Sequence, residues 1–443
     1  MGMGAIQSII KFIKDRPLLE RMINGTLWNA IGTGFQRGLN IISFIIVARL
    51  VGVKGFGELG IIQNTAMMFQ VFAGFGLGLT STKYVAELRH SNPHRAGRII
   101  GLSRVVSIAI GSISGVLMVM FSPLLCKKVL AAPHLVDALR VSAVMIFFGA
   151  LNGAQIGVLI GLEAFSIMAF INIVSGIANL IIIVCFTYWR GVNGAVYGLT
   201  LGMVLNWFMS MVVLKKEARR SGISIGNVRK CMEERSTLWN FSIPAVLSGL
   251  ILTPTIWYCN ALLVNSPNGY YEMGIFNAAN QWRMAILFLP SVTSTAVLPL
   301  LSHLFGEENR DRYDSALRYS LLSNMVIAII GAFIVIVFSP ISMGLYGEEF
   351  ARGTTVFNVL ALSAVVTAFT GVIGQAIVSS GRIWYGFMFN FLWACAIICL
   401  TLFLVPLKGA LGLACAFLGA YLLHSIWQSI YLKRVLRKRA ALY

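Results

Sequence analysis

Long apolar stretches alternate along the chain with short segments that hold most of its lysine and arginine residues. A helix needs about 20 apolar residues to cross a bilayer, and twelve stretches reach that length. Their approximate limits are 26–50, 56–79, 99–121, 141–160, 164–188, 192–214, 241–264, 273–299, 319–339, 355–379, 383–405 and 409–431. Because backbone groups in lipid must form hydrogen bonds within the protein, each stretch is predicted to be a transmembrane helix.

Short motifs recur in the second half of the chain in the same order as in the first. Four pairs share this order and a nearly constant spacing: residues 26–29 and 237–240, 55–61 and 269–275, 80–82 and 293–295, and Gly194-Ala195 and Gly409-Ala410. Because six predicted spans separate the copies, both halves have the same orientation in the membrane. The pattern predicts an all-α polytopic membrane protein with two six-helix lobes, related by a pseudo-two-fold axis along the membrane normal.

These elements divide the chain into five parts. They are an amino-terminal segment (1–25), a first lobe (26–214), a basic linker (215–240), a second lobe (241–431) and a basic tail (432–443). In the amino-terminal segment, isoleucines recur at helical spacing beside lysines. This pattern predicts a short amphipathic helix on the membrane surface before the first span.

Composition and charge narrow the class of protein. Hydrophobic residues make up 58% of the 443 residues, and charged residues make up only 12%, about half their share in soluble domains. The net charge of +19 comes from basic residues that are concentrated in both tails and in the even-numbered connections between spans. The positive-inside rule therefore predicts that both termini are cytoplasmic. Because these residues determine topology and face anionic lipid, we expect no nucleic-acid partner.

Away from the ends of the predicted spans, every formal charge is an arginine: Arg37, Arg104 or Arg283. A guanidinium near the centre of the bilayer costs about 3 kcal/mol on insertion scales. Arg37 and Arg283 lie deep in their spans, so we expect them to bind an anionic group within the membrane. Arg104 lies closer to the cytoplasmic boundary, where its side chain can extend to the interface.

Polar side chains form faces on the first and eighth predicted spans, and these faces should point inward because lipid offers no hydrogen-bond partners. The candidate substrate-binding residues are Asn29, Thr33, Gln36, Arg37, Asn40, Asn277, Asn280, Gln281 and Arg283. For isolated asparagine or serine residues, hydrogen bonds that only hold the helices together are the alternative. Pro244, Pro254 and Pro290 interrupt the seventh and eighth spans and are candidate gating positions, because proline bends helices.

The sequence lacks the residue patterns that a metal site, a nucleotide-binding site or an enzyme active site would require. The seven cysteines and five histidines are scattered, so no metal site and no cofactor are predicted. A phosphate-binding loop of the Walker type is absent. The longest cytoplasmic connection is short and basic and carries no set of paired acids or nucleophiles, so the chain is not expected to be an enzyme.

Several motifs resemble the multidrug/oligosaccharidyl-lipid/polysaccharide exporter superfamily. Residues 49–52 (RLVG) and 55–57 (GFG) resemble the entry to its second helix, and 240–244 (NFSIP) resembles its seventh. Residues 277–282 (NAANQW), with 288–290 and 298–300, resemble the eighth helix of the Wzx-type O-antigen flippases in its polysaccharide branch. The resemblance implies a central cavity between two lobes, lined by helices one, two, seven and eight.

The same resemblance implies a function. Such a flippase moves undecaprenyl-pyrophosphate-linked oligosaccharides across the bacterial inner membrane by alternating access. Arg37 and Arg283 would pair with the pyrophosphate. A polysaccharide polymerase and glycosyltransferases are the implied partners, and the coupling ion is not identified. The alternative is a cation-coupled multidrug antiporter, but the acidic residues lie in connections, in tails or at span ends, with Glu58 and Glu272 only at helix mouths.

Overall fold

The computed structural model describes residues 17–74, 76–224, 231–234, 243–306 and 310–440, and the regular structure within these ranges is helical. The predicted surface helix at residues 1–25 lies mainly outside them. The helices of the first half are α2 (Pro17–Gly74), α3 (Leu77–Ser91), α4 (Pro93–Leu124), η1 (Leu125–Val129), η2 (Pro133–Leu135), α5 (Val136–Gly161), α6 (Phe165–Arg220) and η3 (Met232–Glu234). Those of the second half are α9 (Ile243–Val264), α10 (Gly269–Ile286), α11 (Phe288–Gly306), α12 (Arg310–Val337), α13 (Ser339–Gly344), η5 (Glu348–Gly353), α14 (Thr354–Ser379) and α15 (Ile383–Ala440).

Seven helical stretches of the described chain are long and apolar enough to cross a membrane. Three of them contain 48, 56 and 51 residues, more than twice the length of one crossing. Each of these three helices, α2, α6 and α15, is two helices joined at a bend, with non-helical backbone at Gly52, at Arg190–Gly191 and at Gly409. The three glycines have positive φ angles, which glycine adopts without the steric cost of a side chain.

The bends of α6 and α15 have nearly the same backbone conformation. Gly191 has φ 56° and ψ −133°, and Gly409 has φ 52° and ψ −128°. The sequence repeat paired Gly409 with Gly194, whereas the bend of the first half lies at Gly191, just before that motif. Two helices also extend past the predicted ends of the lobes. Helix α6 continues into the predicted linker, and α15 continues through most of the predicted tail.

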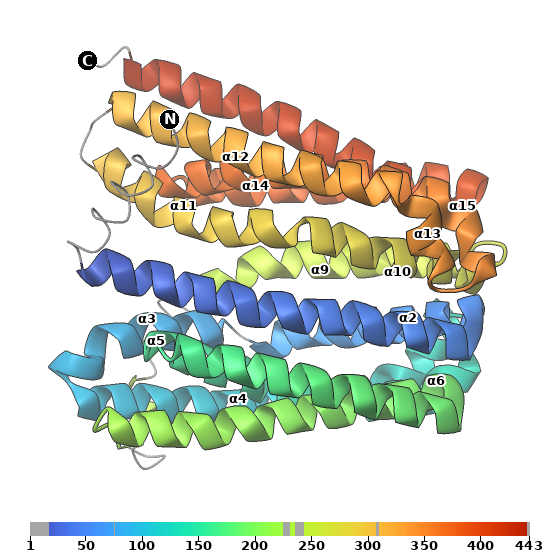
Figure 1. Ribbon diagram of the computed structural model, residues 1–443, viewed down its shortest axis with the longest axis horizontal. Helices are drawn as coiled ribbons and strands as arrows, with labels where there is room; N and C mark the ends of the chain where they lie inside the picture. The colour runs from blue at the N-terminus through green and yellow to red at the C-terminus, as the bar shows by residue number, and fades with distance from the viewer. Residues whose placement is uncertain (1–16, 75, 225–230, 235–242, 307–309, 441–443) are drawn as a thin grey trace.

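The helices run side by side and form two groups, with α2 between them (Figure 1). Helices α3–α6 pack together on one side, while α9–α15 pack together on the other. Helix α2 contacts α5 and α6 of the first group and α9 and α10 of the second. We call the end of the molecule at which α2 begins and α15 ends the terminal end, and the opposite end, where α2, α6 and α15 bend, the far end.

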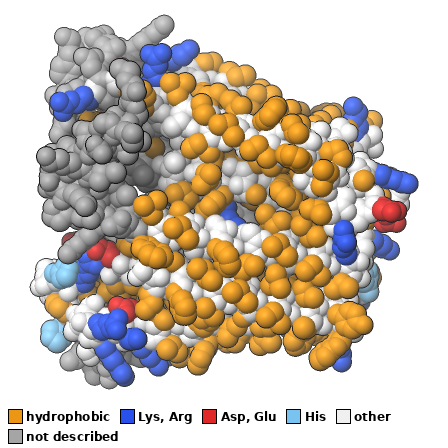
Figure 2. Space-filling model, viewed as in Figure 1, with side chains coloured by type: hydrophobic (Ala, Val, Ile, Leu, Met, Phe, Trp, Pro, Cys, Tyr) orange, Lys and Arg blue, Asp and Glu red, His pale blue; other side chains and the backbone are white. Residues whose placement is uncertain are grey.

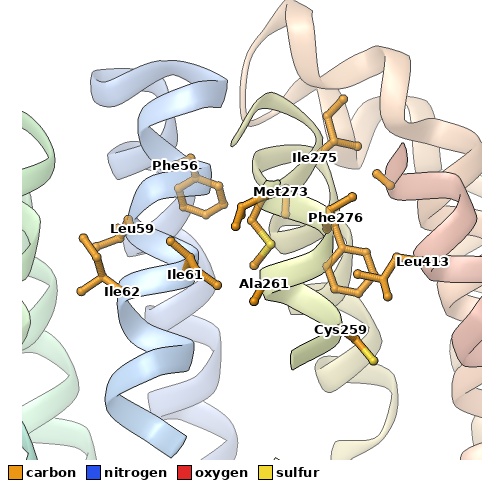
Figure 3. Close-up of a cluster of buried hydrophobic side chains, with 14 of the residues drawn as sticks. Phe56, Leu59, Ile61, Ile62, Cys259, Ala261, Met273, Ile275, Phe276 and Leu413 are labelled. Atoms are coloured by element: carbon orange, nitrogen blue, oxygen red, sulfur yellow. The ribbon is translucent and has the colours of Figure 1, made fainter. Parts of the chain in front are cut away.

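A hydrophobic cluster joins the two groups near the far end. Phe56 and Ile61 of α2 lie opposite Met273 and Phe276 of α10 in this cluster (Figure 3), and all four side chains are buried. Buried side chains in such a cluster hold helices together by van der Waals packing, about 0.1–0.2 kcal/mol for each pair of atoms in contact. The structure is therefore closed between the groups at the far end.

Two glycines allow α2 and α10 to touch backbone to backbone in this region. A Cβ atom at Gly57 would lie 1.9 Å from the carbonyl oxygen of Tyr270, and one at Gly274 would lie 2.0 Å from that of Val53. Any side chain at either position would force the helices apart. The close approach therefore depends on the absence of a Cβ atom at both positions.

The linker between the two groups is attached to the start of α4. Glu234 accepts hydrogen bonds from Arg95 Nε and Arg98 Nη2, each at 3.0 Å to Oε1, and only 8% of its side chain is exposed. Gly97 lies against the carbonyl oxygen of Ser224, which a Cβ atom would approach to 1.9 Å. These contacts hold the described part of the linker on the first group of helices.

Weakening this attachment should expose Cys231, which is fully buried beside it. Burial raises the pKa of the Cys231 thiol, and Arg98 only partly opposes this effect, so the thiol should react slowly at neutral pH. Glu234→Gln removes charge-assisted hydrogen bonds. In a variant whose sole cysteine is Cys231, it should speed maleimide labelling about 10-fold.

The matched control is Asp137→Asn, which removes an exposed ion pair with Arg140 elsewhere in the first group. Its labelling rate should equal that of the parent. Equal rates for Glu234→Gln and the parent would show that the ion pairs do not hold the linker.

Candidate substrate-binding site between the two halves

Arg37 lies on α2 where it faces the second half of the molecule. Its Nη1 donates to the carbonyl oxygen of Met284 at 3.4 Å, and its guanidinium carbon lies 4.8 Å from the centroid of the Phe288 ring. The Arg37 side chain is exposed, and no carboxylate of the described chain forms an ion pair with it. Most of its five N–H donors are therefore available to a ligand.

The surface between the halves is hollowed where α2 crosses the molecule. Figure 2 shows a largely hydrophobic face with a central hollow in which a basic side chain is visible. The surrounding hydrophobic surface suits contact with lipid chains, whereas a cation at the base of the hollow suits an anionic ligand.

The polar face of α2 opens into a pocket of about 260 Å³ within the first group of helices. Asn29, Thr33 and Gln36 line this pocket from α2, and Asn172, Asn206 and Ser210 line it from α6. Thr33 Oγ1 donates to Asn29 Oδ1 at 3.3 Å, and Gln36 Nε2 donates to Ser175 Oγ at 3.4 Å. The pocket thus combines amide and hydroxyl groups that can exchange hydrogen bonds with a polar ligand.

The sequence analysis did not identify the α6 side of this pocket. Asn172 and Asn206 are amide residues inside apolar stretches, the same signal that selected the residues of α2. The sequence alone could not show that Asn172 and Asn206, on the two stretches of α6, face α2. Only the packing of α6 against α2 brings them together.

The remaining polar candidates lie nearer to the contact between the halves. Asn277 lies against α2, because a Cβ atom at Gly60 would be 2.7 Å from its Nδ2. Buried polar atoms of Asn277 and Asn280 have no hydrogen-bond partner in the structure. Asn40 and Gln281 are partly exposed. The candidate substrate-binding residues therefore do not all line one pocket. Asn40 lies on α2, the helix that also carries Arg37.

Arg283 points into the second half and away from Arg37. It is only 3% exposed. Its Nε donates to Ser363 Oγ at 2.9 Å, and its Nη2 donates to Thr367 Oγ1 at 3.0 Å. The guanidinium also lies over the rings of Phe417 and Tyr421, where cation–π contact is favourable. In this conformation Arg283 joins α10 to α14 and α15, rather than facing the hollow.

The prolines occupy different positions in their helices. Pro254 lies inside α9, where its ring removes a backbone donor. Pro290 lies in the first turn of α11, just beyond the break at Leu287 that divides the predicted eighth span into α10 and α11. Pro244 lies in the first turn of α9, and its side chain is outside the described residues. The predicted span 273–299 is therefore not one continuous helix.

Hydrogen bonds close the far end around the hydrophobic cluster. Tyr270 donates from its hydroxyl to the carbonyl oxygen of Leu130 at 2.6 Å. Asn265 Nδ2 donates to that of Val129 at 2.6 Å. Each bond joins the second half of the chain to the first. A ligand that enters the hollow therefore meets a closed barrier at the far end.

Acidic residues near this barrier have structural partners. Glu58 Oε1 lies 3.0 Å from His134 Nε2, and Glu272 Oε2 accepts from the backbone N–H of Ala410 at 2.7 Å. The second contact satisfies a donor where α15 resumes after its bend. A search of the described residues finds no group of three side chains suited to hold a metal ion.

Comparison with known proteins identifies the fold and the family of the chain. The sequence profile described as polysaccharide biosynthesis protein matches residues 22–305, and the MatE profile matches residues 245–403. A solved inward-facing MATE transporter of the MOP superfamily shares the fold, with a TM-score of 0.74 at 16% identity over 92% of this chain and 96% of that one.

Two relatives align over nearly their whole length. The EPS I polysaccharide export inner membrane protein EpsE of Ralstonia solanacearum is 21% identical over 402 residues, which cover 90% of each chain. The lipid III flippase of Escherichia coli (strain K12) is 21% identical over 407 residues, which cover 91% of this chain and 96% of that one. These findings confirm the predicted superfamily and the prediction that the chain is not an enzyme. The chain is a membrane transporter that belongs to the polysaccharide biosynthesis protein family.

Proposed function

We propose that this transporter is a flippase for an oligosaccharide linked to undecaprenyl pyrophosphate, such as an O-antigen unit or a related surface polysaccharide unit. The observation that carries the proposal is the guanidinium of Arg37, which contacts the second half of the molecule and forms no ion pair with any carboxylate of the described residues. Arginine suits a phosphate because its planar donors can form two parallel hydrogen bonds. The names of the two relatives, one for polysaccharide export and one for a lipid flippase, support this substrate class.

The hydroxyl groups of a sugar explain why a protein is needed. Moving a hydroxyl from water into hydrocarbon without a partner costs several kcal/mol, on the order of 4–8 on alkane scales, so a sugar crosses a bilayer very slowly unaided. The polar pocket beside Asn29 and Asn206 offers hydrogen bonds to the sugar, while the lipid chain can stay in the bilayer. We propose that the halves then rock to open the far end, with Pro254 and Pro290 as bending points.

The membrane arrangement in this proposal has twelve spans in two lobes. The bent helices α2, α6 and α15 would supply two spans each. Helices α4, α5, α9, α12 and α14 would supply one each, and α10 with α11 would supply the twelfth. The lobes would be related by an axis along the membrane normal. Both termini would lie on the cytoplasmic side of the bacterial inner membrane, as the positive-inside rule predicts.

The two arginines have different roles in the proposal. Arg37 would bind the pyrophosphate directly. Arg283, buried among Ser363, Thr367 and aromatic rings, would hold α10 in place and would meet substrate only after the second half rearranges. The proposal also includes a coupling ion and contacts with a polymerase or glycosyltransferases, but it assigns no residues to them.

A cation-coupled multidrug antiporter is the second candidate. The match of residues 245–403 to the MatE profile favours it. Cationic drugs call for a buried carboxylate, whereas Glu58 and Glu272 are held by His134 and Ala410 at the far end. The charge in the hollow therefore has the sign that suits the flippase.

Deletion of the gene tests this choice. We expect loss of the surface glycan and accumulation of its lipid-linked unit on the cytoplasmic side of the membrane, because synthesis would continue without translocation. The measurement is mass spectrometry of lipid-linked sugars together with antibody staining of the cell surface. Normal surface glycan combined with hypersensitivity to cationic drugs would instead establish the antiporter.

A further inference from the structure

A second cavity opens on the flank of the first half. Helices α4, α5 and α6 enclose about 300 Å³. Its walls are mainly apolar, with Ile108, Phe147, Phe148, Leu151, Trp207 and Met211 among the lining residues. The polar pocket beside Asn29 uses other positions of α5 and α6, including Ile156, Leu159 and Asn206. The two cavities therefore lie on different faces of the α5–α6 pair.

The wall of this flank cavity is fixed by internal contacts. With its amide oriented to satisfy both groups, Gln155 donates to the carbonyl oxygen of Trp207 at 3.2 Å and accepts from the Trp207 indole N–H at 3.1 Å. The ring of Phe148 packs edge-on against Trp207, with 4.9 Å between centroids. The indole is thus held in position before any ligand binds, which lowers the entropy lost on binding.

Two cations lie among the lining residues of the flank cavity, and no acid does. Arg104 comes from α4 and Lys215 from the end of α6, and both side chains are exposed. Lys215 also lines a neighbouring, more polar pocket of about 420 Å³ with Arg219 and Ser224. The nearby Glu217 is held by Arg220 at 2.9 Å. An apolar cavity and a basic polar pocket therefore meet at Lys215.

The position of Arg104 along α4 matches the boundary between headgroups and lipid chains. Arg98 is paired with Glu234 of the linker, outside the apolar stretch. Arg104 is six residues further along α4, which is about 9 Å at the rise of an α-helix. A side chain at that depth reaches the phosphate level of the bilayer. The apolar cavity then lies at the depth of the lipid chains.

We propose that this flank site binds an anionic glycerophospholipid from the leaflet at the terminal end of the molecule. One acyl chain would enter the cavity along Phe147 and Trp207, and the phosphate would bind Arg104 and Lys215. The remaining headgroup would occupy the pocket beside Arg219 and Ser224. The argument for this occupant is complementarity of charge and polarity, because the site is apolar at chain depth, cationic at phosphate depth and free of acids among its lining residues.

Quenching of Trp207 fluorescence by brominated lipids tests the proposal. The full chain would be reconstituted in phosphatidylcholine vesicles that contain either dibrominated phosphatidylglycerol or dibrominated phosphatidylcholine. The Trp207 signal is the difference between the protein and its Trp207→Phe variant. We expect phosphatidylglycerol to quench Trp207 at a lower mole fraction than phosphatidylcholine does. Each cation near the surface contributes a factor of about 5 to anionic lipid affinity, so Arg104→Ala with Lys215→Ala should reduce the preference about 30-fold.

Two further variants distinguish binding at this site from general attraction to basic surface and from loss of folding. Lys216→Ala removes a neighbouring exposed charge that lines neither pocket, and the preference should persist. Ile108→Phe should obstruct the mouth of the cavity without adding an indole, and should reduce quenching of Trp207 by both brominated lipids. Thermal unfolding of each variant in detergent should match the parent, because Ile108 and both cations are exposed.

Three results would overturn the proposal. Equal quenching by the two lipids would exclude a preference for an anionic headgroup. A loss of preference in Lys216→Ala as large as that in the Arg104→Ala, Lys215→Ala double variant would show only general attraction to the basic surface. Displacement of phosphatidylglycerol by undecaprenyl phosphate at a lower mole fraction would identify a polyprenyl lipid as the occupant instead.

Discussion

Replacing Arg37 by alanine should lower export of the lipid-linked glycan about 10- to 100-fold, without lowering the amount of protein in the membrane. The range corresponds to the loss of a hydrogen bond to a charged group, about 1.5–3 kcal/mol. Protein levels should hold because, among the described residues, Arg37 makes one long hydrogen bond and one ring contact. The measurements are surface glycan per cell and transporter per membrane, determined on the same culture.

Variants of other arginines supply the controls. Arg37→Lys should fall between the parent and alanine, because lysine keeps the charge but loses the bidentate geometry. Arg140→Ala, at an exposed ion pair with Asp137, should export normally. Arg283→Ala should lower the amount of protein as well as export, because it leaves Ser363 and Thr367 without their donor. Normal export by Arg37→Ala would remove the main support for the proposed substrate.

Introducing a methyl group at Gly57 should open the far end of the molecule. The Cβ of Gly57→Ala would lie 1.9 Å from the backbone oxygen of Tyr270, so α2 and α10 must separate. Overpacking of this kind costs about 1–3 kcal/mol. Ile61 of α2 is fully buried in the same cluster, and an Ile61→Cys probe in a background without other cysteines reports on the opening. Its alkylation should be about 5- to 150-fold faster with Gly57→Ala.

Gly38→Ala is the matched control for this prediction. It lies on the same helix, and its Cβ atom would meet nothing within 4 Å. The probe at position 61 should therefore react at the parent rate, and export should be unaffected. If both alanine variants accelerate labelling equally, helix α2 is responding to a change in its own stability, and the contact with Tyr270 is not the cause.

The comparisons confirm the class of protein that the sequence predicted, and the reason is the solvent. A bilayer imposes a minimum length on every apolar helix and a large cost on every buried charge, so both leave clear marks on the sequence. The same marks selected Arg37, which the structure places at the contact between the halves. The twelve-span arrangement and the substrate remain predictions.

The position of a helix bend was less predictable. The motif repeat paired Gly194 with Gly409 without predicting a bend, and the bend of α6 lies at Gly191. Several glycines occur in this part of α6, and the sequence does not show which of them adopts a positive φ angle. Gly194 serves close packing instead, because a Cβ atom there would lie 1.9 Å from the carbonyl oxygen of Phe186 on the preceding stretch.

The sequence by itself determined that the chain is a helical membrane protein, that the formal charges away from the ends of its apolar stretches are arginines, and where along the chain those charges fall. These properties depend on local composition, which hydrocarbon constrains strongly. Only the tertiary structure decided the direction in which each arginine points. Arg37 and Arg283 have the same chemistry and similar depth in the sequence, yet one is exposed beside Met284 and Phe288 and the other is buried against α14 and α15. That difference comes from the rotation of each helix against its neighbours, which no single stretch of sequence records.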